Sequence, residues 1–190
     1  MRVLMIGAPG AGKGTQGTRV AEHYAIQHIS SGDLLRAHIA NGSSIGRAAR
    51  SYVERGDLVP DAVVLDMLRK PIVGASETGG YVLDGFPRTV EQAGIAYEVA
   101  KGLGVEVQIA VHLDVSREEL VRRLLSRGRG SDDSRDVIEH RLEVYEQKTL
   151  PMLEYYTQRE AVVVVDGGQP VDAVTVRMLA GLEAQRRARG

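Results

Sequence analysis

A glycine-rich stretch near the N-terminus, residues 7–15, contains the residue types that bind phosphate groups. Its glycines allow tight turns, so that successive backbone N–H groups can converge on one anion. Lys13 adds a full positive charge for the outer phosphates of a nucleotide. The spacing of Gly7, Gly12 and Lys13 fits the phosphate-loop pattern, although residue 14 is glycine and the hydroxyl that can meet a metal ion follows at Thr15. An ordinary glycine turn is the alternative, but the lysine in register favours a polyphosphate site.

A second candidate site begins where the apolar run Tyr81–Leu83 ends in Asp84. In a parallel sheet, such a carboxylate lies at the carboxyl edge, beside the phosphate loop. There it can hold a magnesium ion through water. Arg88 follows within the same loop, and its planar guanidinium can bind a phosphate group in a bidentate manner. The stretch therefore predicts a second phosphate-binding position at the same edge.

Further arginines follow later in the chain. Arg123 and Arg127 are four residues apart on one predicted helix, Arg129 lies just past its end, and Arg141 borders the apolar stripe of the next helix. Like charges at that spacing repel by a few tenths of a kcal/mol, roughly, a cost that an arriving anion would offset. This grouping favours phosphoryl transfer, which needs positioning and charge neutralisation more than a general base.

Five short apolar runs must position these residues, and they predict a doubly wound α/β fold with a five-stranded parallel sheet. The expected strands are Val3–Ile6, Gln27–Ile29, Tyr81–Leu83, Val107–Leu113 and Val162–Val165. The helical patterns between them are Thr18–Tyr24, Asp33–Ala40, Ile45–Arg55, Ala62–Arg69, Ser116–Ser126, a helix through Ile138 and Leu142 that ends or kinks near Pro151, and a last helix from Pro170 with a frayed tail at 185–190.

Composition narrows the class of protein. The 190 residues carry a formal net charge of -1, which argues against a surface built for long nucleic acid or an anionic membrane. There is no cysteine, so neither a disulfide framework nor a thiolate zinc site is possible. No run approaches the ~18 apolar residues of a membrane span. We expect a cytoplasmic protein, and a monomer because no apolar helix face is left over.

The glycine loop ending in Gly12-Lys13-Gly14-Thr15, together with the stretch from Asp84 to Arg88, resembles the nucleoside monophosphate kinases, and most closely the adenylate kinases. The resemblance runs from Met1 to about Leu182. It implies that the chain transfers a phosphoryl group reversibly from Mg·ATP to AMP, giving two ADP. It also implies one kinase domain, with core segments 1–29, 60–126 and 137–190, a helical AMP-binding insertion at 30–59 and a short lid at 127–136, without a lid zinc.

The resemblance assigns roles by position. The ATP phosphates would lie on Gly10, Ala11, Gly12, Lys13, Gly14 and Thr15, with Arg123, Arg127 and Gln169 completing the ATP site. AMP would contact Ser31, Arg36, Asp57, Leu58, Val59, Gly85, Phe86, Pro87, Arg88 and Gln92, where Gln92 reads the adenine edge. Lys13, Arg88, Arg129 and Arg141 would act on the transferred group, and Asp84, with Thr15 as a further candidate, would serve the magnesium ion.

Two alternatives stay open at this point. A UMP/CMP kinase shares both motifs, and the amide of Gln92 favours adenine because it can bond both the 6-amino group and a ring nitrogen. A nucleotide-dependent switch module would have one tight nucleotide site, and its arginines at 36 and 88 would have no second phosphate group to bind.

Overall fold

The computed structural model describes residues 1–127 and 134–189. Within them, five parallel strands form one sheet in the order β2-β3-β1-β4-β5, which confirms the predicted fold class. The strands are β1 (Arg2–Gly7), β2 (Gln27–Ser30), β3 (Tyr81–Asp84), β4 (Ile109–Asp114) and β5 (Ala161–Asp166). The fourth strand begins at Ile109, two residues later than expected. Because all five are parallel, the loops that follow β1 and β3 leave the same edge of the sheet.

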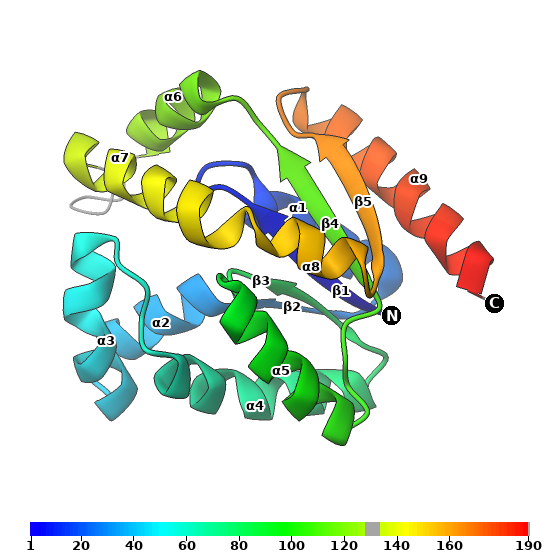
Figure 1. The fold of residues 1–190 in the computed structure, drawn as a ribbon, viewed down its shortest axis with the longest axis horizontal. Coiled ribbons are helices and arrows are strands. Elements are labelled where there is room, and N and C mark those ends of the chain that lie inside the picture. The colour runs from blue at the N-terminus through cyan, green and yellow to red at the C-terminus, as the bar shows by residue number, and fades with distance from the viewer. Residues whose placement is uncertain (128–133, 190) are drawn as a thin grey trace.

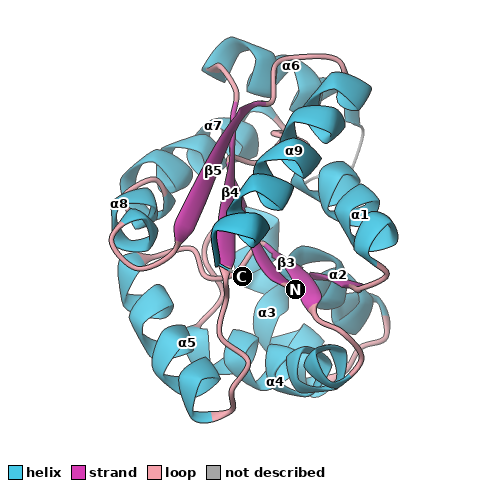
Figure 2. Cartoon of the chain, turned by 90° about the vertical axis from the view of Figure 1, so that its right-hand side faces the viewer, coloured by secondary structure: helices cyan, strands magenta, loops and turns pink. Residues whose placement is uncertain are grey.

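Helices cover both faces of this sheet (Figures 1 and 2). They are α1 (Lys13–Tyr24), α2 (Ser31–Ala40), α3 (Ser44–Arg55), α4 (Asp61–Glu77), α5 (Val90–Gly102), α6 (Arg117–Arg127), α7 (Arg135–Val144), α8 (Met152–Thr157) and α9 (Val171–Arg189). Figure 2 shows α1 and α9 on one face and α5 and α8 on the other. Along β1, Val3 and Met5 belong to one apolar cluster and Leu4 and Ile6 to the other. The uninterrupted apolar run of this strand thus reflects burial on both faces.

Two helices are longer than the sequence predicts. Helix α4 continues from Asp61 to Glu77, although Pro71 lies inside it and removes one backbone donor. Buried side chains on both sides of the proline, among them Met67 and Ala75, hold the helix in place. Helix α9 reaches Arg189, so the expected frayed tail is wrong. There the Arg189 guanidinium donates to Glu160 at 3.3 Å and ties the helix end to the body of the protein.

The expected kink before Pro151 takes the form of a π-helical turn, η2 (Tyr145–Thr149), between α7 and α8. In it the N–H of Leu150 donates to the carbonyl of Tyr145 at 2.9 Å, one residue further back than in an α-helix. Tyr145 and Thr149, the first and last residues of this turn, both line a cavity at the carboxyl edge of the sheet.

The surface of α5 corrects one premise of the sequence analysis. Ile95 and Val99 on this helix and Leu103, its C-cap, follow one another at intervals of four residues and are 41%, 45% and 44% exposed, so an apolar helix face is left over after all. The expectation of a monomer loses its stated reason and stays a prediction. In the described part of the chain, no helix is both long and apolar enough to cross a membrane.

Candidate active site

A cavity of about 940 Å³ opens at the carboxyl edge of the sheet, where the connections of β1 and β3 diverge. In open parallel sheets this is the position where ligands bind. Figure 1 shows α2 and α3 below this edge and α6 and α7 above it. The glycine loop, the stretch from Asp84 to Arg88, and side chains of α6 and α7 all line the same space. Lys13 and Arg88 therefore face one shared crevice, as two neighbouring phosphate sites require.

The glycine loop presents backbone to this cavity. Gly12, the residue that caps α1, has a φ of 96°, a left-handed conformation that glycine adopts without strain. A Cβ atom built on it would meet nothing within 4 Å, so the backbone there is open to a ligand. No side chain caps the start of α1, and the first N–H groups of a helix have no partner within it. These amides, at the positive end of the helix dipole, form an anion site.

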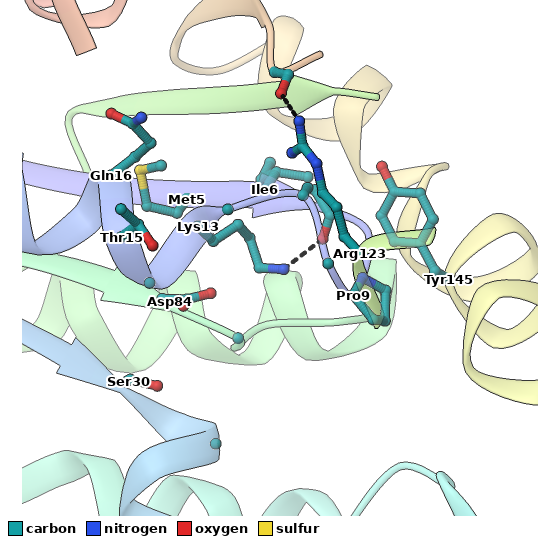
Figure 3. Close-up of a pocket in the computed structure, with 18 of the residues that line it drawn as sticks. Met5, Ile6, Pro9, Lys13, Thr15, Gln16, Ser30, Asp84, Arg123 and Tyr145 are labelled. Carbon is teal, nitrogen blue, oxygen red and sulfur yellow. Dashed lines mark hydrogen bonds between the residues drawn. The ribbon is translucent and has the colours of Figure 1, made fainter. Parts of the chain in front are cut away.

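The Lys13 ammonium is held in place at the floor of the cavity (Figure 3). It donates to the carbonyl oxygens of Gly7 at 2.8 Å and Ala8 at 3.0 Å. Burial lowers the pKa of Lys13, the nearby Asp84 carboxylate opposes that shift, and the charges of Arg88, Arg141 and Arg127 add to it. Burial likewise lowers the pKa of the Arg88 guanidinium, with Asp84 opposing and Arg36 adding to the effect. These cations crowd one cavity, which favours a polyanionic ligand.

The charge balance of the cavity points the same way. Its described lining includes three carboxylates, Asp33, Asp84 and Glu119. Against these stand seven cationic side chains: Lys13, Arg36, Arg88, Arg122, Arg123, Arg127 and Arg141. Some of this charge is already paired, since Arg36 bonds Asp33, and Glu119 accepts from Arg122 and Arg123 at 2.6 Å each. The repulsion expected between Arg123 and Arg127 is therefore offset by Glu119, a partner that the sequence analysis did not weigh.

Arg123 also connects the cavity wall to the loop after β5. Its guanidinium donates to the carbonyl of Gly167 at 2.9 Å, as Figure 3 shows. In that loop Gln169 donates to the carboxylate of Asp166 at 2.7 Å. Both Arg123 and Gln169 line the large cavity, on the side of the glycine loop where the ATP site was expected.

A smaller cavity of about 60 Å³ adjoins the large one and shares Arg36, Leu58, Gly85, Arg88 and Arg141 with it. Ser31 lies in its wall, is 1% exposed, and its hydroxyl has no hydrogen-bond partner among the described residues. Gly85 can lie close to the Ser31 hydroxyl because it has no side chain; a Cβ on it would lie 2.6 Å from that hydroxyl. A buried hydroxyl without a partner is costly. A ligand atom in this cavity would satisfy it.

Gln92 lines the smaller cavity from the start of α5. Thr89 caps this helix and accepts from the N–H of Gln92 at 3.1 Å, while the Gln92 side chain accepts from the N–H of Arg88 at 2.7 Å, an arrangement close to a capping box. Its amide nitrogen donates to Asp61 at 2.6 Å. The residue expected to read adenine is thus held at both ends of its amide, a connection that the sequence did not reveal.

The segment after α3 contacts α7 across the cavity. The His140 ring lies 2.8 Å from the Asp57 carboxylate, which also accepts from Arg55 at 2.8 Å. Hydrogen bonds from His140 and then Arg55 lower the pKa of Asp57. A Cβ on Gly56 would lie 2.7 Å from Cγ of Arg141, so only glycine allows this approach. His140 thus bridges α7 and the segment after α3.

Every predicted site residue in the described part of the chain lines one or both cavities. Arg129 falls outside the described residues. Sequence reasoning missed Tyr145 and Thr149, which line the large cavity from the two ends of the π-helical turn, and Asp61, which holds Gln92. Thr149 donates to the carbonyl of Arg88 at 2.8 Å and so supports the loop of that arginine. None of the three belongs to a recognisable motif, and the contacts of Thr149 and Asp61 join segments far apart in the sequence.

Comparison with known proteins supports the resemblance to adenylate kinases independently of the structure. The family model described as adenylate kinase matches residues 5–161. Adenylate kinases of Leptospira biflexa, Kocuria rhizophila and Trichodesmium erythraeum are 45%, 43% and 41% identical to the chain; the alignments cover 94%, 96% and 92% of it, and 97%, 98% and 94% of those relatives. With both motifs facing one cavity and matches over nearly the whole length, the chain belongs to the adenylate kinase family.

Proposed function

We propose that ATP binds on the glycine-loop side of the large cavity and AMP on the side of the smaller one, with Lys13 and Arg88 between the two phosphate tails. Family membership makes the chain an ATP:AMP phosphotransferase and confirms the predicted activity; the UMP/CMP kinase alternative is not favoured. The observation that carries our placement is the shared lining of one crevice by Lys13 and Arg88.

In the proposed reaction an oxygen of the AMP phosphate attacks the γ-phosphorus of ATP. The bond from that phosphorus to the bridging oxygen breaks, and two ADP molecules result. Lys13, Arg88 and Arg141 meet the negative charge of the transferred group, and the backbone amides of the glycine loop hold the ATP phosphates. Holding both reactants in one water-poor crevice favours transfer to AMP over transfer to water.

Asp84 is the residue that would serve a magnesium ion. It is 8% exposed, lines the large cavity, and its carboxylate lies about 4.0 Å from the position of a Cβ on Gly14. No cluster of three or more potential metal ligands occurs in the described residues. One carboxylate suits magnesium, which keeps several waters and is otherwise bound by substrate phosphates. Thr15, exposed at the start of α1, is the second candidate ligand. The ion, when bound, would neutralise phosphate charge.

The division into a core, an AMP-binding insertion at 30–59 and a lid at 127–136 stays part of the proposal. Contacts of Gly56 and Asp57 with α7 support an insertion that closes over the AMP side, since they join it to the opposite wall of the cavity. Closure of both segments would exclude water during transfer.

Arg88→Ala tests the placement. We expect turnover with ATP and AMP to fall by about 10³-fold or more, because the guanidinium meets charge that develops on the transferred group. Arg159→Ala is a matched control, because Arg159 is exposed just past the end of α8 and lines neither cavity. Near-normal turnover of Arg88→Ala would remove Arg88 from the mechanism.

A two-headed analogue, two adenosines joined through five phosphates, tests whether the crevice holds two nucleotides. It should bind far more tightly than ATP to the unaltered enzyme, since one molecule would fill both sites. Binding no tighter than ATP would support a single-site switch module instead.

A further inference from the structure

We propose that Asp61 sets the base specificity of the AMP site by fixing which way round the side-chain amide of Gln92 lies. This inference rests on the proposed function, in which Gln92 faces the base of AMP. It assigns a positioning role to a residue that itself need not touch the nucleotide.

The two partners of Gln92 allow only one orientation of its amide. Oε1 accepts from the backbone N–H of Arg88 at 2.7 Å, and Nε2 donates to the Asp61 carboxylate at 2.6 Å. A backbone N–H can only donate, and an ionised carboxylate can only accept. Turning the amide over would place a donor against the N–H and an acceptor against the carboxylate. Gln92 is 4% exposed, so water cannot readily relieve either mismatch.

The fixed amide leaves one lone pair on Oε1 and one hydrogen on Nε2 of Gln92 for a ligand. The adenine edge offers a matching pair, a 6-amino donor beside the ring nitrogen N1, an acceptor. Hypoxanthine has the same size and shape but presents the inverse, a 6-oxo acceptor beside an N1–H donor. Guanine and uracil present the inverse pattern too. Only an amide that can turn over would accept both patterns.

Helix capping explains the bond to Arg88 but not the bond to Asp61. Gln92 is the third residue of α5 and Thr89 its cap, so the contact of Oε1 with the nearby backbone is the local one expected there. Asp61, by contrast, is the first residue of α4 and lies 31 residues away in the sequence. Without its carboxylate the cap would remain, and the amide would lose one of its two constraints.

Asp61→Asn is the decisive variant, assayed by kcat/KM with AMP and with inosine monophosphate. In Asp61→Asn the side-chain nitrogen can donate to Oε1 of a reversed Gln92, so reversal leaves one mismatch instead of two. We expect the preference for AMP over inosine monophosphate to fall by about tenfold, with an absolute gain for inosine monophosphate. A merely structural role would lower both activities together and leave their ratio unchanged. Asp61→Ala, which removes the acceptor altogether, is a second variant with the same expectation should Asp61→Asn fail to fold.

Asp66→Asn provides the matched control, since Asp66 is exposed on the same helix and lines neither cavity. It makes the same charge change and should leave the AMP preference unchanged. Gln92→Ala separates the two hypotheses. If Gln92→Ala keeps the full preference for AMP, the base-reading part of the proposed function is wrong. If Gln92→Ala loses the preference while both Asp61 variants keep it, the role of Asp61 is overturned and the proposed function stands.

Discussion

The two halves of the crevice are built in different ways. On the ATP side, the glycine loop and the start of α1 form the anion site within one short stretch of chain, and Lys13 is held by carbonyl groups five and six residues before it. On the AMP side, the wall combines the start of α2, the segment after α3, the loop after β3 and part of α7. Its hydrogen bonds join residues that are distant in sequence, such as Asp57 with His140 and Asp61 with Gln92.

This difference implies that the two halves are sensitive to substitutions at different kinds of position. The anion site of the glycine loop follows from local backbone geometry, so it should survive changes elsewhere in the molecule and fail only when its own residues change. The AMP wall depends on how several helices pack, so residues that never touch the nucleotide can alter it. Variants on each side test this contrast.

Lys13→Met should have the largest effect and act on catalysis alone. It keeps most of the aliphatic stem and removes the charge, and we expect turnover to fall by about 10³-fold or more. The melting temperature should change little, because relief of the desolvation that lowers the pKa of Lys13 offsets the loss of its bonds to the carbonyls of Gly7 and Ala8. Steady-state kinetics and thermal unfolding measure the two effects. Lys101→Met, at the end of α5, is the control. A clear fall in the melting temperature of Lys13→Met relative to that control would contradict a purely functional role for Lys13.

Ser31→Ala should affect binding of AMP without cost to the fold. Because the buried Ser31 hydroxyl has no partner among the described residues, its removal should leave the free energy of unfolding nearly unchanged or slightly higher. The KM for AMP should rise by about tenfold if the hydroxyl bonds the phosphate group.

Ser30→Ala is the natural comparison for that variant. The Ser30 hydroxyl caps α2 by accepting from the N–H of Asp33 at 3.2 Å, so its loss should cost about 1 kcal/mol of stability. Equal destabilisation by the two variants would show that the Ser31 hydroxyl is bonded within the folded protein, against our interpretation of the AMP wall.

The same contrast explains how far the sequence could predict the structure. The sheet, the glycine loop and Arg88 were predictable because their signals are local: an apolar run, a glycine spacing, a charge after a strand. Asp61, His140 and Thr149 were not, because each matters only through a partner brought close by packing. The continuation of α4 through Pro71 was not predictable for a related reason, since buried contacts outweigh the local signal of a proline. Local rules predict the chemistry of phosphate binding, and the three-dimensional packing decides which nucleotide the site accepts.

Glu119→Gln should have the smallest effect and would sharpen the ATP side of the comparison. Arg122 and Arg123 lower the pKa of Glu119 to about 2, below the ordinary value of 4.5. The stabilising effect of the carboxylate is therefore fully present above about pH 4.5 and is lost as the pH falls towards about 2. In the variant this part of the pH dependence of unfolding should disappear.

Kinetics give a second measurement on Glu119→Gln. Arg123 would lose the partner that holds it beside Gly167, so the KM for ATP should rise about two- to fourfold while the KM for AMP stays unchanged. Glu118→Gln, exposed one residue earlier on α6, is the control. If Glu119→Gln instead raised the KM for AMP, a local ion pair on the ATP side would be acting across the crevice. Our interpretation of this ion pair as a support of the ATP side alone would then be wrong.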